Sequence, residues 1–267
     1  MELETLVLVM NLIIIFFIFV IGISIGSFLN VLIYRIPLSI SVAKGRSFCP
    51  KCKHTLSALD LIPVFSWLFL GRKCRYCSDK ISVQYPLIEL ITGFLFVIAY
   101  LEFGYTIDFL RIAVLFSVLV VISVIDIYEQ NIYDITVIFG IVSTLILLVI
   151  NYFAFEGELL TYFISAGVSF GVYLLIFLIS YKIYGEEVFG KGDVFLAILM
   201  GLNIPANLLY FTVCFPFIVA LACVIIGKLY AVIKKSELDN MVPFGPFMAI
   251  SCVIVSLYGD HLMNIVF

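Results

Sequence analysis

This sequence contains very few charged residues. Asp, Glu, Lys and Arg make up only 12% of its 267 residues, whereas 64% are hydrophobic. An average soluble domain carries roughly 25% charged residues, about twice this share. The low charge excludes an ordinary soluble domain and predicts an all-α polytopic membrane protein.

Basic residues are also absent before the first apolar run, which follows Met1-Glu-Leu-Glu4. A cleaved secretory signal would begin with a positively charged segment. Residues 6–33 are therefore expected to stay in the protein as its first membrane span.

Seven apolar runs are long enough to cross a bilayer. They lie near residues 6–33, 86–103, 108–126, 133–153, 159–181, 205–228 and 246–266. A shorter run, 194–202, brings the total to about eight membrane segments. It is expected either to span partially or to merge with the next run across Asn203-Ile-Pro205. The sequence shows no internal repeat and no low-complexity tract.

The same pattern divides the chain into three parts. These are a first span (1–33), a cytoplasmic insert (34–85) and a membrane core (86–267). Basic residues concentrate in the insert, in 182–193 and in 228–240, while the opposite loops contain no Lys or Arg. Cytoplasmic loops are enriched in Lys and Arg. Eight segments with an outside N-terminus place all three basic regions in the cytoplasm and both termini outside.

Two aspartates border the most apolar stretches of the chain. Asp126 ends the run that begins at Ser117, and Asp193 follows Phe189-Gly-Lys-Gly. A carboxylate beside hydrocarbon is costly and needs a partner or a function. The topology puts both at the cytoplasmic face, where they can meet. Two close carboxylates that share one proton can activate water for hydrolysis, as in aspartic proteases.

Other interpretations of these aspartates stay open. Asp193 could cap a helix N-terminus, with Gly190 and Gly192 shaping the turn, and Asp126 could be an interfacial residue at a helix end. A proton-coupled transporter is a second functional class, although it usually needs ionisable residues through the membrane midplane. A binding or assembly protein is a third class, and it predicts that replacing either aspartate with Asn leaves function intact.

Four cysteines in the insert have the spacing of a tetrahedral zinc site. They form Cys49-x-x-Cys52 and Cys74-x-x-Cys77. Two such turns supply four thiolates and leave no open position for catalysis, so the predicted Zn²⁺ is structural. Disulfides are the competing interpretation, which a reducing cytoplasm disfavours.

Several motifs, in this order and spacing, carry a family resemblance. They are Gly26–Pro37, the double CxxC, Asp60–Trp67, Tyr85–Gly93, Asp126, Gly190-Lys-Gly-Asp193 and Pro243-Phe-Gly-Pro246. Together they resemble the bacterial type IV prepilin leader peptidases, which are GxGD-type membrane aspartyl peptidases. The resemblance runs nearly from end to end of the chain.

The resemblance implies two activities. The first is cleavage of the short basic leader of prepilins or pseudopilins at the cytoplasmic membrane face. Asp126 and Asp193 would be catalytic there, and Gly190, Lys191 and Gly192 would support the catalytic loop. The second is methylation of the new N-terminal amine by S-adenosylmethionine. The sequence has no glycine-rich nucleotide loop, so it predicts no residues that bind this donor. The expected partners are the prepilin, with its basic leader and apolar helix, and the lipid bilayer, but no nucleic acid.

The chain departs from the family pattern in two places. Tyr133 precedes Asp134 where many relatives have Pro, and Phe195 stands where many have Lys. Both departures bear on substrate fit or local geometry rather than on the reaction class. Asn30, Arg35, Glu89 and Gly93 match family motifs, and the alternative interpretation of these four is helix packing and capping.

Overall fold

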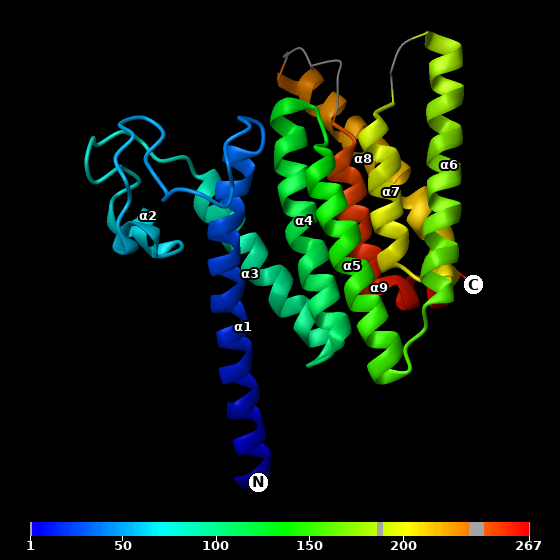
Figure 1. Cartoon of the computed structure of the whole chain (residues 1–267), viewed down its shortest axis with the longest axis horizontal. Helices are drawn as coiled ribbons and strands as arrows, with labels where there is room; N and C mark the ends of the chain where they lie inside the picture. Colours follow the sequence, from blue (N-terminus) through cyan, green and yellow to red (C-terminus); the bar gives the residue numbers. More distant parts are fainter. Residues whose placement is uncertain (1, 186–188, 235–242, 267) are drawn as a thin grey trace. The chain divides into compact units, whose positions relative to one another are not determined.

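The computed structural model describes residues 2–185, 189–234 and 243–266 (Figure 1). These residues are mostly helical and contain no β-strand, only two isolated bridges, Phe48–Thr55 and Lys73–Lys80. The predicted all-α membrane class is therefore confirmed. The far part of the basic region 228–240, including Lys235, lies outside the described residues.

The elements follow one another along the chain in an order that the apolar runs anticipate. They are α1 (Glu2–Arg35), η1 (Ala58–Leu61), α2 (Phe65–Phe69), α3 (Gln84–Phe103), α4 (Ile107–Glu129), α5 (Asp134–Phe155), α6 (Leu160–Tyr184), α7 (Lys191–Asn203), η2 (Ala206–Leu208), α8 (Leu209–Lys234) and α9 (Gly245–Val266).

Seven of the described helices are long and apolar enough to cross a membrane, and they correspond to the seven long runs. The eighth segment, α7, has 13 residues. At 1.5 Å per residue it covers about 20 Å, less than the roughly 30 Å hydrocarbon layer. It does not merge with the next run, because Ile204 before Pro205 adopts an extended conformation that ends the helix. Of the two expectations for this segment, the merged helix is therefore wrong, and the partial span stays a prediction.

The chain forms two compact units, Met1–Phe109 and Leu110–Phe267. In the first unit, α1 packs along α3. A Cβ atom on Gly26 would lie 2.7 Å from the Glu89 Cα, and one on Gly22 would lie 2.8 Å from the Gly93 Cα. Glycine at these positions lets the two backbones approach closely, as small residues do between membrane helices.

The insert in this unit is built from two turns of the same design, residues 49–54 and 74–79, which we call the knuckles. In each, the first cysteine donates its N–H to the carbonyl five residues later and accepts a hydrogen bond from the N–H four residues later: Cys49 with His54 and Lys53, and Cys74 with Asp79 and Ser78. Lys53 and Ser78 both have positive φ. This short structural repeat escaped the sequence analysis, because the residues between the cysteines differ.

In the second unit, the short helix α7 packs against α5, α6 and α9 (Figure 1). Nine of its 13 residues are buried. A Cβ on Gly201 would lie 2.5 Å from the Ala166 Cα in α6, and one on Gly140 in α5 would lie 2.8 Å from the Leu199 side chain. Because its neighbours enclose it, α7 can carry a carboxylate at its start without exposing that group to lipid.

Candidate active site and metal centre

Asp126 lies three residues before the end of α4 and is only 5% exposed. Its Oδ2 accepts a 2.9 Å hydrogen bond from the backbone N–H of Gly245, the first residue of α9. A Cβ on Gly245 would lie 2.8 Å from the same oxygen. Asp126 is therefore not a solvated helix end: it is a buried carboxylate held by the N-terminus of another helix.

Asp193 is the third residue of α7 and is 7% exposed. The N-cap of this helix is Gly190, so the interpretation of Asp193 as the N-cap is wrong. A Cβ on Gly190 would lie 2.9 Å from the Asp193 Oδ2. The other oxygen, Oδ1, has no hydrogen-bond partner among the described residues. It is a buried acceptor that water or a substrate can use.

The structure brings Asp126 and Asp193 into the wall of one cavity of about 450 Å³. The rest of the wall comes from the turn between α4 and α5 (130–134) and from Gly190, Lys191 and Gly192. Ile132 of that turn lies against two glycines, since a Cβ on Gly192 would lie 2.6 Å from the Ile132 Cβ and one on Gly245 would lie 3.4 Å from the Ile132 Cδ1. All five predicted residues of the aspartate site thus meet at one place.

The two departures from the family pattern have different positions. Tyr133 and Asp134 line this cavity, so they are placed to contact whatever enters it. Phe195 is 47% exposed on α7 and is not part of the cavity wall.

An aromatic cluster joins the loop before Gly190 to the loop before Gly245. It is made of Tyr173, Phe189, Phe217 and Phe244. Phe189 precedes Gly190 and Phe244 precedes Gly245, and their ring centroids are 5.6 Å apart. Phe217 of α8 lies 5.2 Å from Phe244 and 5.7 Å from Tyr173. Such ring pairs stabilise a contact by roughly 1 kcal/mol beyond the area they bury. Sequence reasoning missed the cluster, and its one signal was a Phe before each glycine.

Arg111 and Asn203 connect α4 and α7 at the ends opposite the aspartates. The Arg111 guanidinium donates to the Asn203 backbone oxygen at 3.0 Å and to its Oδ1 at 3.2 Å, and it lies 4.8 Å from the Tyr162 ring centroid. Asn203 also donates to Thr144 of α5. Arg111 and Asp126 lie towards opposite ends of α4, and Asn203 and Asp193 lie towards opposite ends of α7. Because the two helices are antiparallel, this buried network sets the register that brings the aspartates together. No pattern in the sequence indicated this role for Arg111.

The four insert cysteines form a donor set that fits a metal ion. Their Sγ atoms all lie within 4.8 Å of one another, and those of Cys49 and Cys77 are 3.9 Å apart. Sulfurs in a tetrahedral zinc site are about 3.8 Å apart, which follows from Zn–S bonds of about 2.3 Å. All seven cysteines are free, so the disulfide interpretation finds no support.

Charge in this cluster also favours a cation. Burial raises the pKa of the Cys49 thiol, but hydrogen bonds from the Cys52 and Lys51 backbone outweigh it and bring the pKa to about 7. For Cys77, the Asp79 backbone hydrogen bond lowers the pKa, whereas burial and the three neighbouring thiols raise it, to about 12. Ionisation of one thiol thus makes ionisation of the next less favourable, because the two negative charges repel each other. A bound metal cation removes that repulsion.

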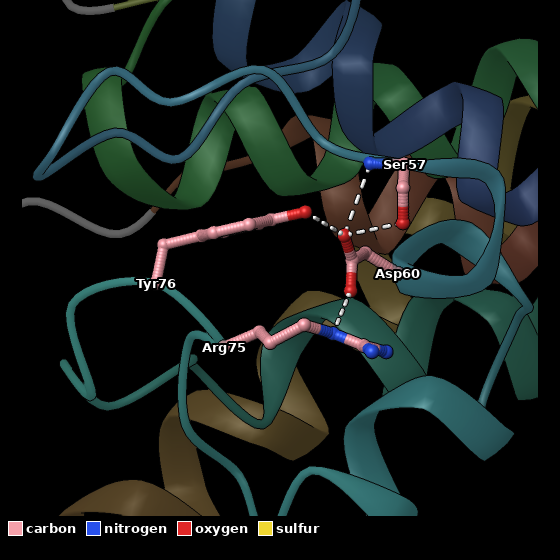
Figure 2. A network of polar contacts seen from close by, with 4 residues as sticks. All are labelled: Ser57, Asp60, Arg75 and Tyr76. Atoms are coloured by element: carbon pink, nitrogen blue, oxygen red, sulfur yellow. Dashed lines mark hydrogen bonds and ion pairs between the residues drawn. The ribbon is translucent and has the colours of Figure 1, made fainter.

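Asp60 braces the second knuckle from outside. Its carboxylate accepts hydrogen bonds from the Ser57 N–H and hydroxyl at 3.0 and 2.7 Å, from the Arg75 Nε at 2.7 Å and from the Tyr76 hydroxyl at 3.0 Å, as Figure 2 shows. Burial raises the pKa of Asp60, but these donors more than offset it and lower the pKa from 3.8 to about 2. Arg75 and Tyr76 lie between the two cysteines, so Asp60 holds the ligand turn in shape.

Two families match the chain. Residues 20–103 match the Bacterial Peptidase A24 N-terminal domain, and residues 113–232 match the Type IV leader peptidase family. No solved structure matches. Nothing in these matches supports the transporter interpretation.

Relatives match over most of the chain. A prepilin leader peptidase/N-methyltransferase of Bacillus subtilis is 30% identical over 92% of this chain and 95% of its own length. A type 4 prepilin-like proteins leader peptide-processing enzyme of Escherichia coli is 32% identical over 86% and 88%. A prepilin leader peptidase/N-methyltransferase of Myxococcus xanthus is 37% identical over 69% of this chain, but the match spans only 54% of that protein.

The seven spans and the bacterial relatives make this chain a multi-pass protein of the inner membrane. The predicted resemblance is confirmed, and the chain belongs to the type IV leader peptidase family.

Proposed function

We propose that this protein removes the short basic leader from type IV prepilins or pseudopilins, with Asp126 and Asp193 as the pair that activates water. The observation that supports this most directly is that both little-exposed carboxyl groups line one cavity. Two negative charges in one poorly solvated cavity repel each other, so the pair is expected to share one proton.

In this reaction one carboxylate accepts a proton from water while the other carboxyl group donates a proton to the scissile carbonyl oxygen. The hydroxide so formed bonds to the carbonyl carbon and gives a tetrahedral intermediate. The carboxyl group that took the proton from water then donates it to the leaving nitrogen, the other carboxylate takes a proton from a hydroxyl of the intermediate, and the carbon–nitrogen bond breaks as the amine leaves. Asp126 is the better candidate for the charged member, because its carboxylate accepts a hydrogen bond from the Gly245 N–H at the N-terminus of α9, whereas the Asp193 Oδ1 has no hydrogen-bond partner among the described residues. Gly245 orients Asp126 through its Oδ2.

The proposed topology places the cavity at the cytoplasmic face, with both termini outside and the insert in the cytoplasm. The distribution of Lys and Arg supports it, since all three basic regions then face inward. A prepilin with a basic leader in the cytoplasm and an apolar helix in the bilayer would present its scissile bond at that level.

We assign the second activity of the family, methylation of the new N-terminal amine by S-adenosylmethionine, to this chain as well. We also assign structural Zn²⁺ to Cys49, Cys52, Cys74 and Cys77, which would stabilise an insert too small for a large core. The chain divisions at 33/34 and 85/86 stay part of this proposal.

The test uses detergent-solubilised protein, a short-leader prepilin and S-adenosylmethionine, with mass spectrometry of the product. We expect loss of the leader and the added mass of a methyl group. Asp126→Asn and Asp193→Asn should each abolish cleavage. Glu129→Gln, which changes an exposed acid one turn after Asp126 and outside the cavity, should cleave normally. Cleavage retained by either Asn variant would refute the proposed pair, and an unmethylated product would remove the second activity.

A further inference from the structure

A second cavity, of about 360 Å³, lies wholly within the first unit. Its wall combines the C-terminal half of α1, the start of α3 and the insert, including Asn30, Tyr34, Trp67, Tyr85 and Glu89. Its volume is in the range of sites that bind small molecules. It contains neither aspartate of the proposed peptidase pair, so its chemistry is a separate question.

Asn30 and Glu89 present acceptor oxygens in this cavity. Asn30 is 4% exposed, and its amide nitrogen donates to the Gly26 and Tyr85 carbonyl oxygens at 3.2 and 3.1 Å. Its Oδ1 has no hydrogen-bond partner among the described residues. Glu89 is 6% exposed and accepts a 2.7 Å hydrogen bond from the Val64 N–H and another from the Ser27 side chain.

Three of the other charged side chains in the wall already have partners. Arg35 donates to the backbone oxygens of Ser41, Lys44, Gly45 and Arg46. Asp60 is paired with Arg75. Within the described part of the chain no ion pair involves Glu89, and the lining lysines, Lys51 and Lys80, are exposed residues of the insert. A buried carboxylate beside an unshared amide oxygen favours a cationic ligand.

The aromatic residues of the wall fit the same kind of ligand. Tyr34, Trp67 and Tyr85 line the cavity, and aromatic rings attract cations within about 6 Å and stack on flat heterocycles. S-adenosylmethionine combines a positive sulfonium with a flat adenine. The methyl acceptor, a new N-terminal amine, is a cation before it loses a proton.

We infer that this cavity is the methyl-transfer site. In it, the acceptor oxygens of Asn30 and Glu89 bind the positively charged sulfonium of the donor and the positively charged amine. The inference rests on the methyltransferase activity proposed above. Glu89 accepts a proton from the ammonium, which frees the nitrogen lone pair to bond to the methyl carbon. As the carbon–sulfur bond breaks, its electron pair stays on sulfur, and the positive charge passes to nitrogen.

Binding measurements can separate the effect of the ligand's positive charge from the effect of its shape. In titration calorimetry of the full-length protein, Glu89→Gln should bind S-adenosylmethionine about ten-fold more weakly or worse. It should bind S-adenosylhomocysteine, whose sulfur is neutral, nearly as wild type does. Gln retains an acceptor for Val64 N–H, so leader cleavage should persist and report an intact fold. Glu102→Gln, on an exposed residue near the other end of α3, is the matched control and should bind both ligands normally.

A second variant tests the cavity and leaves Glu89 and its hydrogen bond to the Val64 N–H unchanged. Val31→Phe fills the cavity from α1 and should weaken both ligands while cleavage continues. Wild-type affinity for both ligands in Glu89→Gln and Val31→Phe would overturn the inference. A wild-type protein that cleaves but never methylates would instead defeat the proposed second activity.

An independent observation concerns the outer surface of the insert. Residues 59–69 expose a run of large apolar side chains, which we call the α2 face: Leu59 (62% exposed), Leu61 (40%), Ile62 (43%), Phe65 (52%), Leu68 (56%) and Phe69 (85%). Single exposed apolar residues are ordinary, but six large ones within eleven residues indicate a surface that something covers.

The attachment of α2 indicates what covers this face. The hydrogen bond from Val64 to Glu89 ties the start of α2 to the sixth residue of α3, about 7 Å along a membrane span. Arg72 and Lys73 come three and four residues after the end of α2, and the Arg72 guanidinium lies 4.9 Å from the Trp67 ring centroid. Apolar and aromatic residues followed by basic ones are typical of segments that lie in the membrane interface.

We propose that the α2 face rests in the lipid headgroup region and so holds the insert against the bilayer. Trp67 is the only tryptophan of the chain, which makes Trp67→Phe a silent background for a reporter. In lipid nanodiscs, Trp67→Phe with Phe69→Trp should emit at short wavelength. Spin labels near the lipid headgroups should quench the emission, whereas aqueous iodide should quench it poorly. The same background with Val42→Trp, in an exposed loop of the insert, calibrates the response of a residue in water.

Two results would contradict a lipid-bound α2 face. Iodide quenching equal to that of the Val42 reporter would show a free insert and overturn the proposal. Protection that appears only after a prepilin is added would assign the α2 face to the substrate, which also overturns it.

Discussion

The contact between Gly245 and Asp126 shows how one missing side chain orients a carboxylate. The Gly245 N–H points at Oδ2 from 2.9 Å, and any Cβ there would lie 2.8 Å from that oxygen. Heavy atoms at such a separation force something to move, and here the group that moves is one of the two proposed catalytic acids. The Pro-Phe-Gly-Pro motif therefore needs glycine at this position, because a larger residue would displace Asp126.

We predict that Gly245→Ala lowers kcat/KM for leader cleavage about ten-fold or more, because Asp126 must rotate or shift. Peptide cleavage followed by mass spectrometry measures it. Gly171→Ala is the control, since Gly171 in α6 has open space around it and should tolerate a methyl group with a change within about 1 kcal/mol. Equal activity of the two alanine variants would contradict this role of Gly245.

Asp60 leads to a prediction about pH and the metal site. Its pKa is depressed to about 2, so its stabilising effect is complete above the ordinary value of 3.8 and is lost as the pH falls through about 2. Asp60→Asn should therefore loosen the second knuckle throughout the neutral range, by up to about 2 kcal/mol. Zinc release to a chelator at pH 7 should be faster in this variant. Unchanged release would mean that the network around Asp60 does not brace the ligands.

At the level of the helices, two contacts fix the position of α7. Arg111 and Asn203 tie its C-terminal end to α4, while the aromatic cluster gathers the loops at its N-terminal end. A segment too short to span the bilayer has little hydrophobic anchoring of its own, so its neighbours must set its depth. The aspartate pair depends on that depth.

We predict that Phe244→Leu lowers kcat for leader cleavage about ten-fold and leaves KM nearly unchanged. The smaller side chain removes the ring contacts to Phe189 and Phe217 and frees the loop before Gly245. Steady-state kinetics on a prepilin peptide separate kcat from KM. Phe153→Leu is a suitable control, because Phe153 is 81% exposed on α5. A rise in KM alone would indicate a substrate contact and argue against this positioning role.

For the whole molecule, the division into two compact units separates the proposed chemistries. The aspartate cavity lies in residues 110–267, and the thiols and the cavity around Glu89 lie in residues 1–109. Loss of the metal should therefore affect one unit more than the other.

We predict about one zinc ion per chain in protein kept reduced, measured by elemental analysis, since one Cys₄ cluster holds one ion. Cys49→Ser with Cys77→Ser should abolish zinc binding and reduce methylation more than leader cleavage. The matched control is Cys214→Ser with Cys223→Ser, which changes two thiols outside the cluster. Zinc near zero in the wild-type protein would reject the metal site.

Local patterns in the sequence were enough to predict the membrane class, the seven long spans and the thiol set. Hydropathy acts residue by residue along a helix, and a CxxC turn brings its two thiols together by itself. The order of motifs was likewise enough for the family. The two aspartates were also chosen from sequence, because an acid beside an apolar run is conspicuous.

Contacts between distant residues could be decided only by tertiary packing. The bond from Gly245 to Asp126 joins residues 119 positions apart, and that from Asn30 to Tyr85 joins residues 55 apart. The same holds for Gly190 replacing Asp193 as the N-cap and for α7 ending at Asn203. Such features depend on which helix faces meet and in which register. That choice is made by side-chain packing across the whole unit, because no local pattern encodes the partner of a distant residue.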